Sequence, residues 1–195
     1  MKKLLITGFD PFGGQRINPA REAVMKLPDE IGDWVLIRAE IPTVFGLAAQ
    51  TVLQLAKQER PDAILCIGLA GGRAAVTPEV YGVNFRYARR ADNAGQMPCC
   101  VPIITGAPAS YQATLPVGDM VSAARAVGVP CELSYSAGRF VCNDLLYTLL
   151  HHFRDSDVKI GFVHIPYMPE QAGEGTASLP LEDSVRALHA MILTI

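Results

Sequence analysis

Hydrophobic residues in this chain fall into short continuous runs separated by segments of helical spacing. The runs predict strands at residues 3–9, 34–41, 62–70, 80–88, 132–136 and 159–167. A continuous run such as DAILCIGLA, at 62–70, is typical of a strand covered on both faces, as in parallel sheets. We therefore expect a largely buried sheet.

Between these runs, apolar residues recur every three or four positions, which predicts helices. The predicted helices span residues 18–27, about 48–60, 117–127, 142–153 and 181–192. Strands interleaved with helices of this length indicate an α/β fold with helices on both faces of the sheet. Because the chain of 195 residues shows no repeat or linker, we expect a single domain over residues 1–195.

Composition narrows the classes of partner. Half of the residues are hydrophobic, 18% are charged and the formal net charge is −2. The low charge suggests a large interior or an apolar surface shared with sister subunits. With no charged block and no apolar span of membrane length, we expect neither nucleic acid nor a membrane as a partner. The run Leu4–Thr7 is too short for a secretory signal, so we expect a cytoplasmic protein.

Five cysteines are present, and their spacing fits no disulfide framework. Cys99 and Cys100 are adjacent, without the two-residue gap of a zinc-binding pair. We therefore expect reduced thiols, no metal site and no cofactor.

Cys142 has the most informative setting of the five, in the segment GRFVCNDLLYTLLHHF. It stands at the start of a predicted helix, where unpaired N–H groups and the helix dipole lower the pKa of a thiol. The same N–H groups can bind an oxyanion. From position alone, however, a small buried hydrophobic residue is the more common role for such a cysteine.

Two further residues complement this cysteine. His164 lies at the end of a predicted strand, in GFVHIPYMP, and could be either a structural residue or the general base that a thiol nucleophile needs. Glu79 directly precedes a predicted strand and could orient the histidine, although a glutamate beside a proline is often solvated surface. Ligands of open α/β sheets bind at the carboxyl ends of strands, where glycines and prolines concentrate here.

Three passages together resemble the pyroglutamyl peptidase I family of cysteine peptidases, also called pyrrolidone-carboxylate peptidases. They are TGFDPFGGQRINPA at 7–20, GLAGGRAAVTPEVYGVNFRYARRADNAG at 68–95, and SAGRFVCNDLLYTLLH at 136–151 followed by GFVHIPYMPEQ at 161–171. The passages are collinear with the family and cover nearly the whole chain.

This resemblance implies a peptidase that removes an N-terminal pyroglutamyl residue from peptides through a thioester acyl-enzyme, without metal or cofactor. It implies a three-layer α/β/α sandwich with a mixed, mostly parallel sheet (phosphorylase/hydrolase-like) and a homo-oligomer, a tetramer or dimer. By motif position Cys142 is the nucleophile, His164 the base and Glu79 its orienting group. Arg89 matches the arginine near the oxyanion. The implied substrate-binding residues are Phe9, Phe12, Leu69, Phe140 and Val141.

The chain departs from the family pattern at the implied site. Leu69 replaces a glutamine, and Arg90 and Ala91 replace an Ile-Pro pair, which alters the pocket rim. Asp144 stands where histidine is common, and we expect its carboxylate to oppose a thiolate on Cys142. Two alternatives therefore stay open: a thiol hydrolase of the same fold acting on another blocked N-terminus, and a non-catalytic module that binds lactams.

Overall fold

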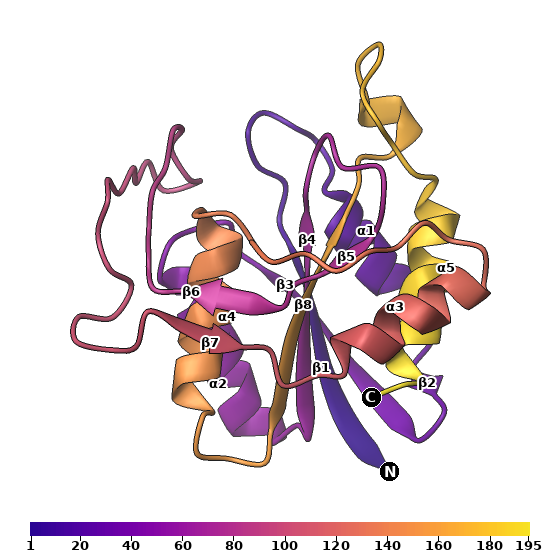
Figure 1. Ribbon diagram of the computed structural model, residues 1–195, viewed down its shortest axis with the longest axis horizontal. Helices are drawn as coiled ribbons and strands as arrows, with labels where there is room; N and C mark the ends of the chain where they lie inside the picture. Colours follow the sequence, from indigo (N-terminus) through magenta and orange to yellow (C-terminus); the bar gives the residue numbers. More distant parts are fainter.

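The computed structural model describes all 195 residues and is built around a six-stranded sheet of order β2-β3-β1-β4-β8-β5 (Figure 1). The four central strands are parallel, and β2 and β5 pair antiparallel at the two edges. The strands of this sheet are β1 (Lys2–Phe9), β2 (Glu30–Ile31), β3 (Trp34–Ile41), β4 (Ala63–Leu69), β5 (Thr77–Pro78) and β8 (Lys159–Ile165). Strands β6 (Tyr81–Val83) and β7 (Ser110–Gln112) form a separate two-stranded antiparallel sheet.

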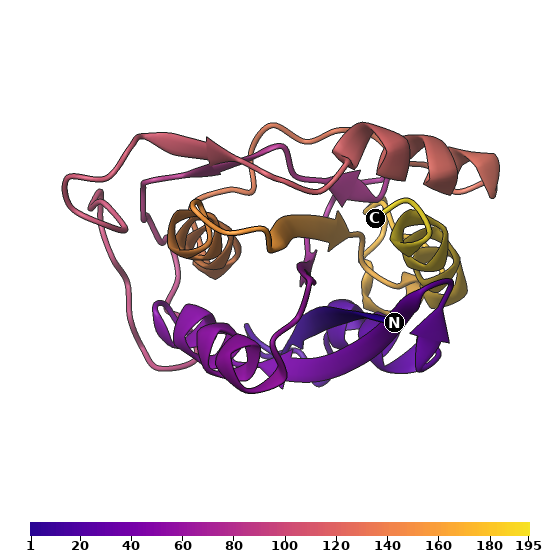
Figure 2. The ribbon, with the colours of Figure 1, turned by 90° about the horizontal axis from the view of Figure 1, so that it is seen from below.

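Five α-helices cover the two faces of the sheet, and a short 3₁₀ turn, η1 (Pro169–Gln171), follows β8. They are α1 (Pro19–Lys26), α2 (Leu47–Glu59), α3 (Val117–Ala126), α4 (Val141–His152) and α5 (Leu181–Ile192). Helices α1, α3 and α5 pack on one face and α2 and α4 on the other, as Figures 1 and 2 both show. None of the five has the length and apolar character that crossing a bilayer requires.

Strand β4 shows why these runs are continuously apolar. Ala63, Leu65 and Ile67 enter the core beneath α1, α3 and α5, whereas Ile64 and Cys66 enter the core beneath α2 and α4. Successive side chains point to opposite faces of a strand, so a strand with helices on both sides needs apolar residues at every position. The α/β class and the mixed, mostly parallel sheet predicted above are confirmed.

Most predicted elements end within two residues of the observed ones, and residues 34–41 match β3 at both ends. Two predicted strands are wrong in extent. Of residues 80–88 only 81–83 form a strand. The Asn84 N–H still donates to the Ala109 carbonyl over 2.8 Å, but its side chain binds the backbone of the 103–107 loop, and beyond it Arg86 pairs with Val101 in an isolated bridge. Residues 132–136 form no strand. Chain 131–134 runs beside 76–80 through the isolated bridges Val76↔Cys131 and Glu79↔Ser134 only.

The β6–β7 sheet packs against α4 at very short range. A Cβ on Gly82 would lie 2.9 Å from the Cα of Tyr147, so the strand and the helix backbone touch where a side chain would hold them apart. The absence of a side chain at position 82 therefore lets strand β6 lie directly against α4.

Candidate active site

A cavity of about 540 Å³ opens at the carboxyl ends of β4 and β8, within the range of about 300–1,000 Å³ usual for small-ligand sites. Its lining combines aromatic, basic and nucleophilic side chains drawn from five separate stretches of the chain. The lining residues are Phe12, Leu69, Ala70, Arg73, Tyr87, Arg89, Arg90, Ala137, Gly138, Arg139, Phe140, Cys142 and His164.

His164 reaches the cavity because of its register in β8. Ile160 and Phe162, four and two residues earlier, face the core beneath α2 and α4, and His164 continues that alternation toward α4. Its ring lies 4.8 Å from the ring of Phe162 between centroids. A Cβ on Gly68 of the neighbouring strand would lie 3.1 Å from the His164 ring and 2.7 Å from Phe162, so a glycine there makes room for both.

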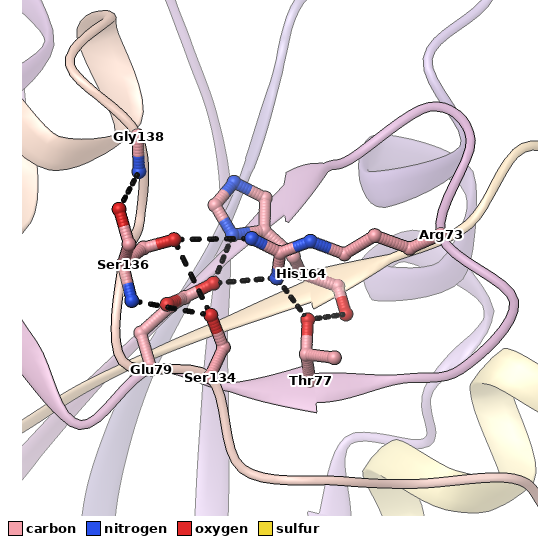
Figure 3. Close-up of polar contacts among 7 residues, drawn as sticks. All are labelled: Arg73, Thr77, Glu79, Ser134, Ser136, Gly138 and His164. Atoms are coloured by element: carbon pink, nitrogen blue, oxygen red, sulfur yellow. Dashed lines mark hydrogen bonds and ion pairs between the residues drawn. The ribbon is translucent and has the colours of Figure 1, made fainter.

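Glu79 is placed beside this histidine by edge strand β5. Thr77 and Pro78 pair antiparallel with His164 and Val163, and the Glu79 N–H donates to the Phe162 carbonyl over 2.9 Å. The Glu79 side chain is fully buried, and its Oε1 lies 2.7 Å from His164 Nδ1 (Figure 3). Glu79 is thus a buried partner of the histidine and not solvated surface.

Arg73 completes this polar cluster, although no sequence motif points to it. Its guanidinium donates to Glu79 Oε1 over 2.8 Å and also to the Thr77 hydroxyl. Its second terminal nitrogen donates to the Ser136 carbonyl over 3.1 Å, which joins the turn after β4 to the segment before α4 (Figure 3). A lone arginine six residues before a glutamate is no motif; only the fold pairs them.

Cys142 is the second residue of α4 and lines the same cavity as His164. The helix begins at Val141, and its N-cap, Phe140, makes no side-chain cap bond. The N–H groups of the first turn therefore have no intrahelical partner and are available to an oxygen of a ligand.

Aromatic rings form one wall of the cavity. The rings of Phe12 and Phe140 lie 6.4 Å apart, and Phe45 packs edge-on against Phe140 at 5.1 Å. The Arg90 guanidinium lies over both Phe12 and Phe140, at 4.9 and 5.8 Å from their centroids. Leu69, the last residue of β4, also lines this space.

Comparison with known proteins decides the family. The family profile described as Pyroglutamyl peptidase matches residues 2–195. The pyrrolidone-carboxylate peptidase of Levilactobacillus brevis is 47% identical over 198 residues, covering 99% of this chain and 97% of that protein. The chain belongs to the pyroglutamyl peptidase family.

Solved structures agree with this assignment to a peptidase family. Pyroglutamyl peptidase I of Bacillus amyloliquefaciens superposes with a TM-score of 0.95 at 40% identity, covering 100% of this chain and 96% of that one. The pyrrolidone carboxyl peptidase from Thermococcus litoralis gives a TM-score of 0.94 at 33% identity, covering 100% and 93%. The predicted family and the predicted peptidase class are confirmed.

Within this peptidase, burial and pairing set the charges of the Glu79–His164 pair. Burial alone would raise the pKa of Glu79, but the hydrogen bond and charge of His164, with Arg73, outweigh it and hold that pKa below its ordinary value. Burial lowers the pKa of His164, Arg73 adds to that effect, and Glu79 offsets it only in part. The pair at neutral pH is therefore a carboxylate and a neutral imidazole.

The Cys142 backbone at the helix start does lower the thiol pKa, as predicted, but this effect is outweighed in the resting protein. Burial, with the charge of Glu79 as the next cause, raises the pKa of Cys142 to about 12. The thiol is consequently protonated at rest, and it needs a base to become a nucleophile.

The expectation for Asp144 is wrong. Its carboxylate is fully buried, with Oδ1 2.5 Å from Arg86 Nε and Oδ2 accepting from the Gly46 N–H over 2.8 Å. The ion pair with Arg86 balances its charge. Glu79, not Asp144, is the carboxylate that disfavours a thiolate on Cys142.

Two of the predicted ring contacts do not line the cavity. Phe9 and Val141 are buried behind it, where Phe9 packs on Phe162 at 6.3 Å between ring centroids. Phe12, Leu69 and Phe140 do line it, as does Arg89. Phe9 and Val141 therefore form part of the core that supports the site.

Proposed function

We propose that the protein hydrolyses the bond after an N-terminal pyroglutamyl residue, with Cys142 as nucleophile, His164 as general base and Glu79 as the group that orients the imidazole. The main support is the 2.7 Å contact between His164 Nδ1 and buried Glu79 Oε1, in a cavity that Cys142 also lines. The three residues come from α4, β8 and the segment after β5.

The aromatic wall suits the ring of such a substrate. Pyroglutamate is a flat lactam with no free amine, so an enzyme cannot hold it through an ammonium group. Phe12 and Phe140 offer ring faces for stacking, and Leu69 adds an aliphatic contact. The lactam N–H and C=O still need partners, because burying them unpaired costs about 1–3 kcal/mol each.

The first step transfers a proton from the thiol to the histidine. Since Glu79 is ionised, it accepts a hydrogen bond from His164 Nδ1–H, which leaves Nε2 with a free lone pair. Nε2 takes the Cys142 proton as the sulfur attacks the scissile carbonyl carbon. The resulting imidazolium is stabilised by the Glu79 carboxylate. The negative charge moves from sulfur to the carbonyl oxygen.

The second half of the reaction releases both products. In this proposal the N–H groups of the first turn of α4 and the Arg89 guanidinium donate hydrogen bonds to the oxyanion. The imidazolium gives its proton to the leaving amine, and the carbon–nitrogen bond breaks to leave a thioester on Cys142. Water, deprotonated by His164, then attacks the thioester and releases pyroglutamate with regeneration of the thiol.

The test uses pyroglutamyl-aminomethylcoumarin and the reduced protein. We expect fluorophore release, at least a thousandfold slower in Cys142→Ala. The matched control is Cys100→Ala, because Cys100 is exposed and does not line the cavity. Cys142→Ala turning over at the control's rate would refute the assignment of the nucleophile. Mass spectrometry of quenched enzyme should find one pyroglutamyl group on Cys142.

A panel of blocked N-termini separates this proposal from a thiol hydrolase of other specificity. We expect pyroglutamyl-alanine amide to be cleaved far faster than acetyl-alanine-alanine amide or prolyl-alanine amide. The reverse order would favour the other hydrolase, and tight binding of pyroglutamate with no turnover would favour a binding module.

We further predict that the protein is cytoplasmic and forms a homo-oligomer. Light scattering would measure the mass of that oligomer.

A further inference from the structure

The cavity has a strongly one-sided charge. Four of its thirteen lining residues are arginines, Arg73, Arg89, Arg90 and Arg139, and none is an aspartate or glutamate. The whole chain is slightly acidic, with 19 Asp and Glu against 17 Lys and Arg. The excess of positive charge at the cavity is therefore a local arrangement of side chains.

Three of these arginines have no carboxylate partner. Arg73 is paired with Glu79, but Arg89, Arg90 and Arg139 are exposed and make no ion pair or side-chain hydrogen bond within the protein. Arg90 lies over Phe12 and Phe140, and Arg139 lies over Phe85 at 5.4 Å. Stacking fixes these two side chains and leaves their N–H groups free for an acceptor.

Nearby carboxylates are engaged elsewhere. Asp92, two residues after Arg90, accepts hydrogen bonds from the backbone N–H groups of residues 45, 94 and 96. Asp10, in the turn that bears Phe12, accepts from the Thr43 N–H and from Asn93. These two carboxylates are thus hydrogen-bonded within the protein and do not neutralise the arginines of the cavity.

A pyroglutamyl ring and a scissile carbonyl do not account for three cations. The lactam is uncharged, and one cation is enough for the oxyanion. The part of the substrate beyond the scissile bond can carry a carboxylate, either its own C-terminus or an acidic side chain. Arginine binds carboxylates through paired N–H donors, more strongly than it binds neutral acceptors. A substrate with a blocked N-terminus also brings no ammonium group for these arginines to repel.

We propose, resting on the function above, that this cavity selects pyroglutamyl substrates with a carboxylate in the leaving group, and that Arg90 and Arg139 are the residues that determine this specificity. Arg89 keeps its proposed role of binding the oxyanion. The substrate class is thus acidic or very short pyroglutamyl peptides, in which a carboxylate lies within one residue of the bond that is cleaved.

The experiment compares kcat/KM within two matched substrate pairs. Pyroglutamyl-glutamate amide against pyroglutamyl-glutamine amide tests an acidic side chain, and pyroglutamyl-alanine against its amide tests a C-terminal carboxylate. In at least one pair we expect kcat/KM to be about tenfold higher for the substrate with the carboxylate. Which pair shows the preference tells whether the cavity recognises an acidic side chain or a C-terminal carboxylate. Raising salt from 0.1 M to 1 M shortens the Debye length from about 10 Å to about 3 Å and should reduce that preference.

Charge-removing variants locate the effect. In Arg90→Gln with Arg139→Gln the ratio within the favoured pair should fall to about one. The control is Arg60→Gln, which removes one charge from an exposed residue at the end of α2, before the amino end of β4 and thus opposite the cavity. Its ratio should equal that of the wild type. Circular dichroism checks that each variant is folded.

The outcomes separate this inference from the proposed function. Cleavage of both neutral amides with ratios near or below one would overturn the inference and leave the proposed function standing. A preference that survives in the double variant would overturn the roles of Arg90 and Arg139. If no pyroglutamyl substrate is cleaved, the proposed function fails and the inference fails with it.

Discussion

Arg73 holds the carboxylate that in turn holds the histidine. Glu79 Oε1 accepts hydrogen bonds from both His164 Nδ1 and Arg73, while Glu79 Oε2 is buried with no hydrogen-bond partner. One oxygen thus carries the whole orienting interaction. A positive charge on Arg73 compensates the carboxylate and also disfavours protonation of the nearby imidazole.

The neutral state of His164 predicts the acid limb of activity. In the proposed mechanism His164 is the general base and must be unprotonated, and burial holds its pKa below the ordinary value of 6.5. We expect kcat/KM for a pyroglutamyl substrate to remain high at pH 6.5 and to fall only at lower pH. A limb with its midpoint above pH 6.5 would contradict this assignment.

Removal of Arg73 should move that limb. In Arg73→Met the positive charge that lowers the His164 pKa is gone, so the limb should shift to higher pH. We also expect kcat to fall about ten- to a hundredfold as Glu79 loses its anchor, with a smaller change in KM. Arg73→Lys, which keeps the charge, should keep the position of the limb. A residue with a merely structural role would change stability without shifting the pH profile.

The first turn of α4 is the element on which the site depends most. Asn143, fully buried, accepts from the Val83 N–H and donates to the Val83 and Phe85 carbonyls over 2.9–3.0 Å. Asp144 binds Arg86 and the Gly46 N–H. The two residues after Cys142 therefore tie the helix start to β6 and to the segment before α2, which fixes where the sulfur lies.

We expect Asn143→Ala to destabilise the fold by about 3 kcal/mol, because it leaves three half-buried backbone groups without their partner. Urea denaturation followed by circular dichroism measures this as a lower midpoint. Ser122→Ala, an exposed change in α3, should stay within about 0.5 kcal/mol of wild type. An equal midpoint for the two variants would show that the Asn143 contacts contribute little.

Elements long enough to show a hydrophobic period could be predicted from the sequence, whereas very short strands and single tertiary contacts could not. The apolar run of β4 and the helical stripe of α5 are long enough to show their periods. Strands β2 and β5 have two residues each and no period to detect. The same holds at the site, where motif positions brought Cys142, His164 and Glu79 to notice but Arg73 needed the tertiary structure.

At the scale of the whole molecule, the buried Glu79–His164 pair links folding stability to pH. The pKa of His164 is depressed in the folded state, so below its ordinary value of 6.5 the unfolded chain binds a proton that the folded protein does not. The pKa of Glu79 is also depressed, so near pH 4.5 the unfolded chain takes up a second proton that the folded protein does not, which removes further stability. Both groups make the folded state less stable as pH falls.

We expect the free energy of unfolding, measured in urea, to fall between pH 6.5 and pH 5 with a slope of at most about 1.4 kcal/mol per pH unit from His164. His164→Asn should flatten that slope even if its overall stability differs. His152→Asn, at an exposed position, should keep it. An unchanged slope in His164→Asn would assign the pH dependence to other groups.

The contacts between Arg73, Glu79 and His164 join distant parts of the chain. Glu79 and His164 are 85 residues apart in the sequence. A refolding chain can recover helix and strand content early, yet it regains turnover only when its last distant segments have docked. Regain of catalysis would therefore time the final step of folding, and a fragment ending before β8 would have no hydrolytic activity whatever its secondary structure.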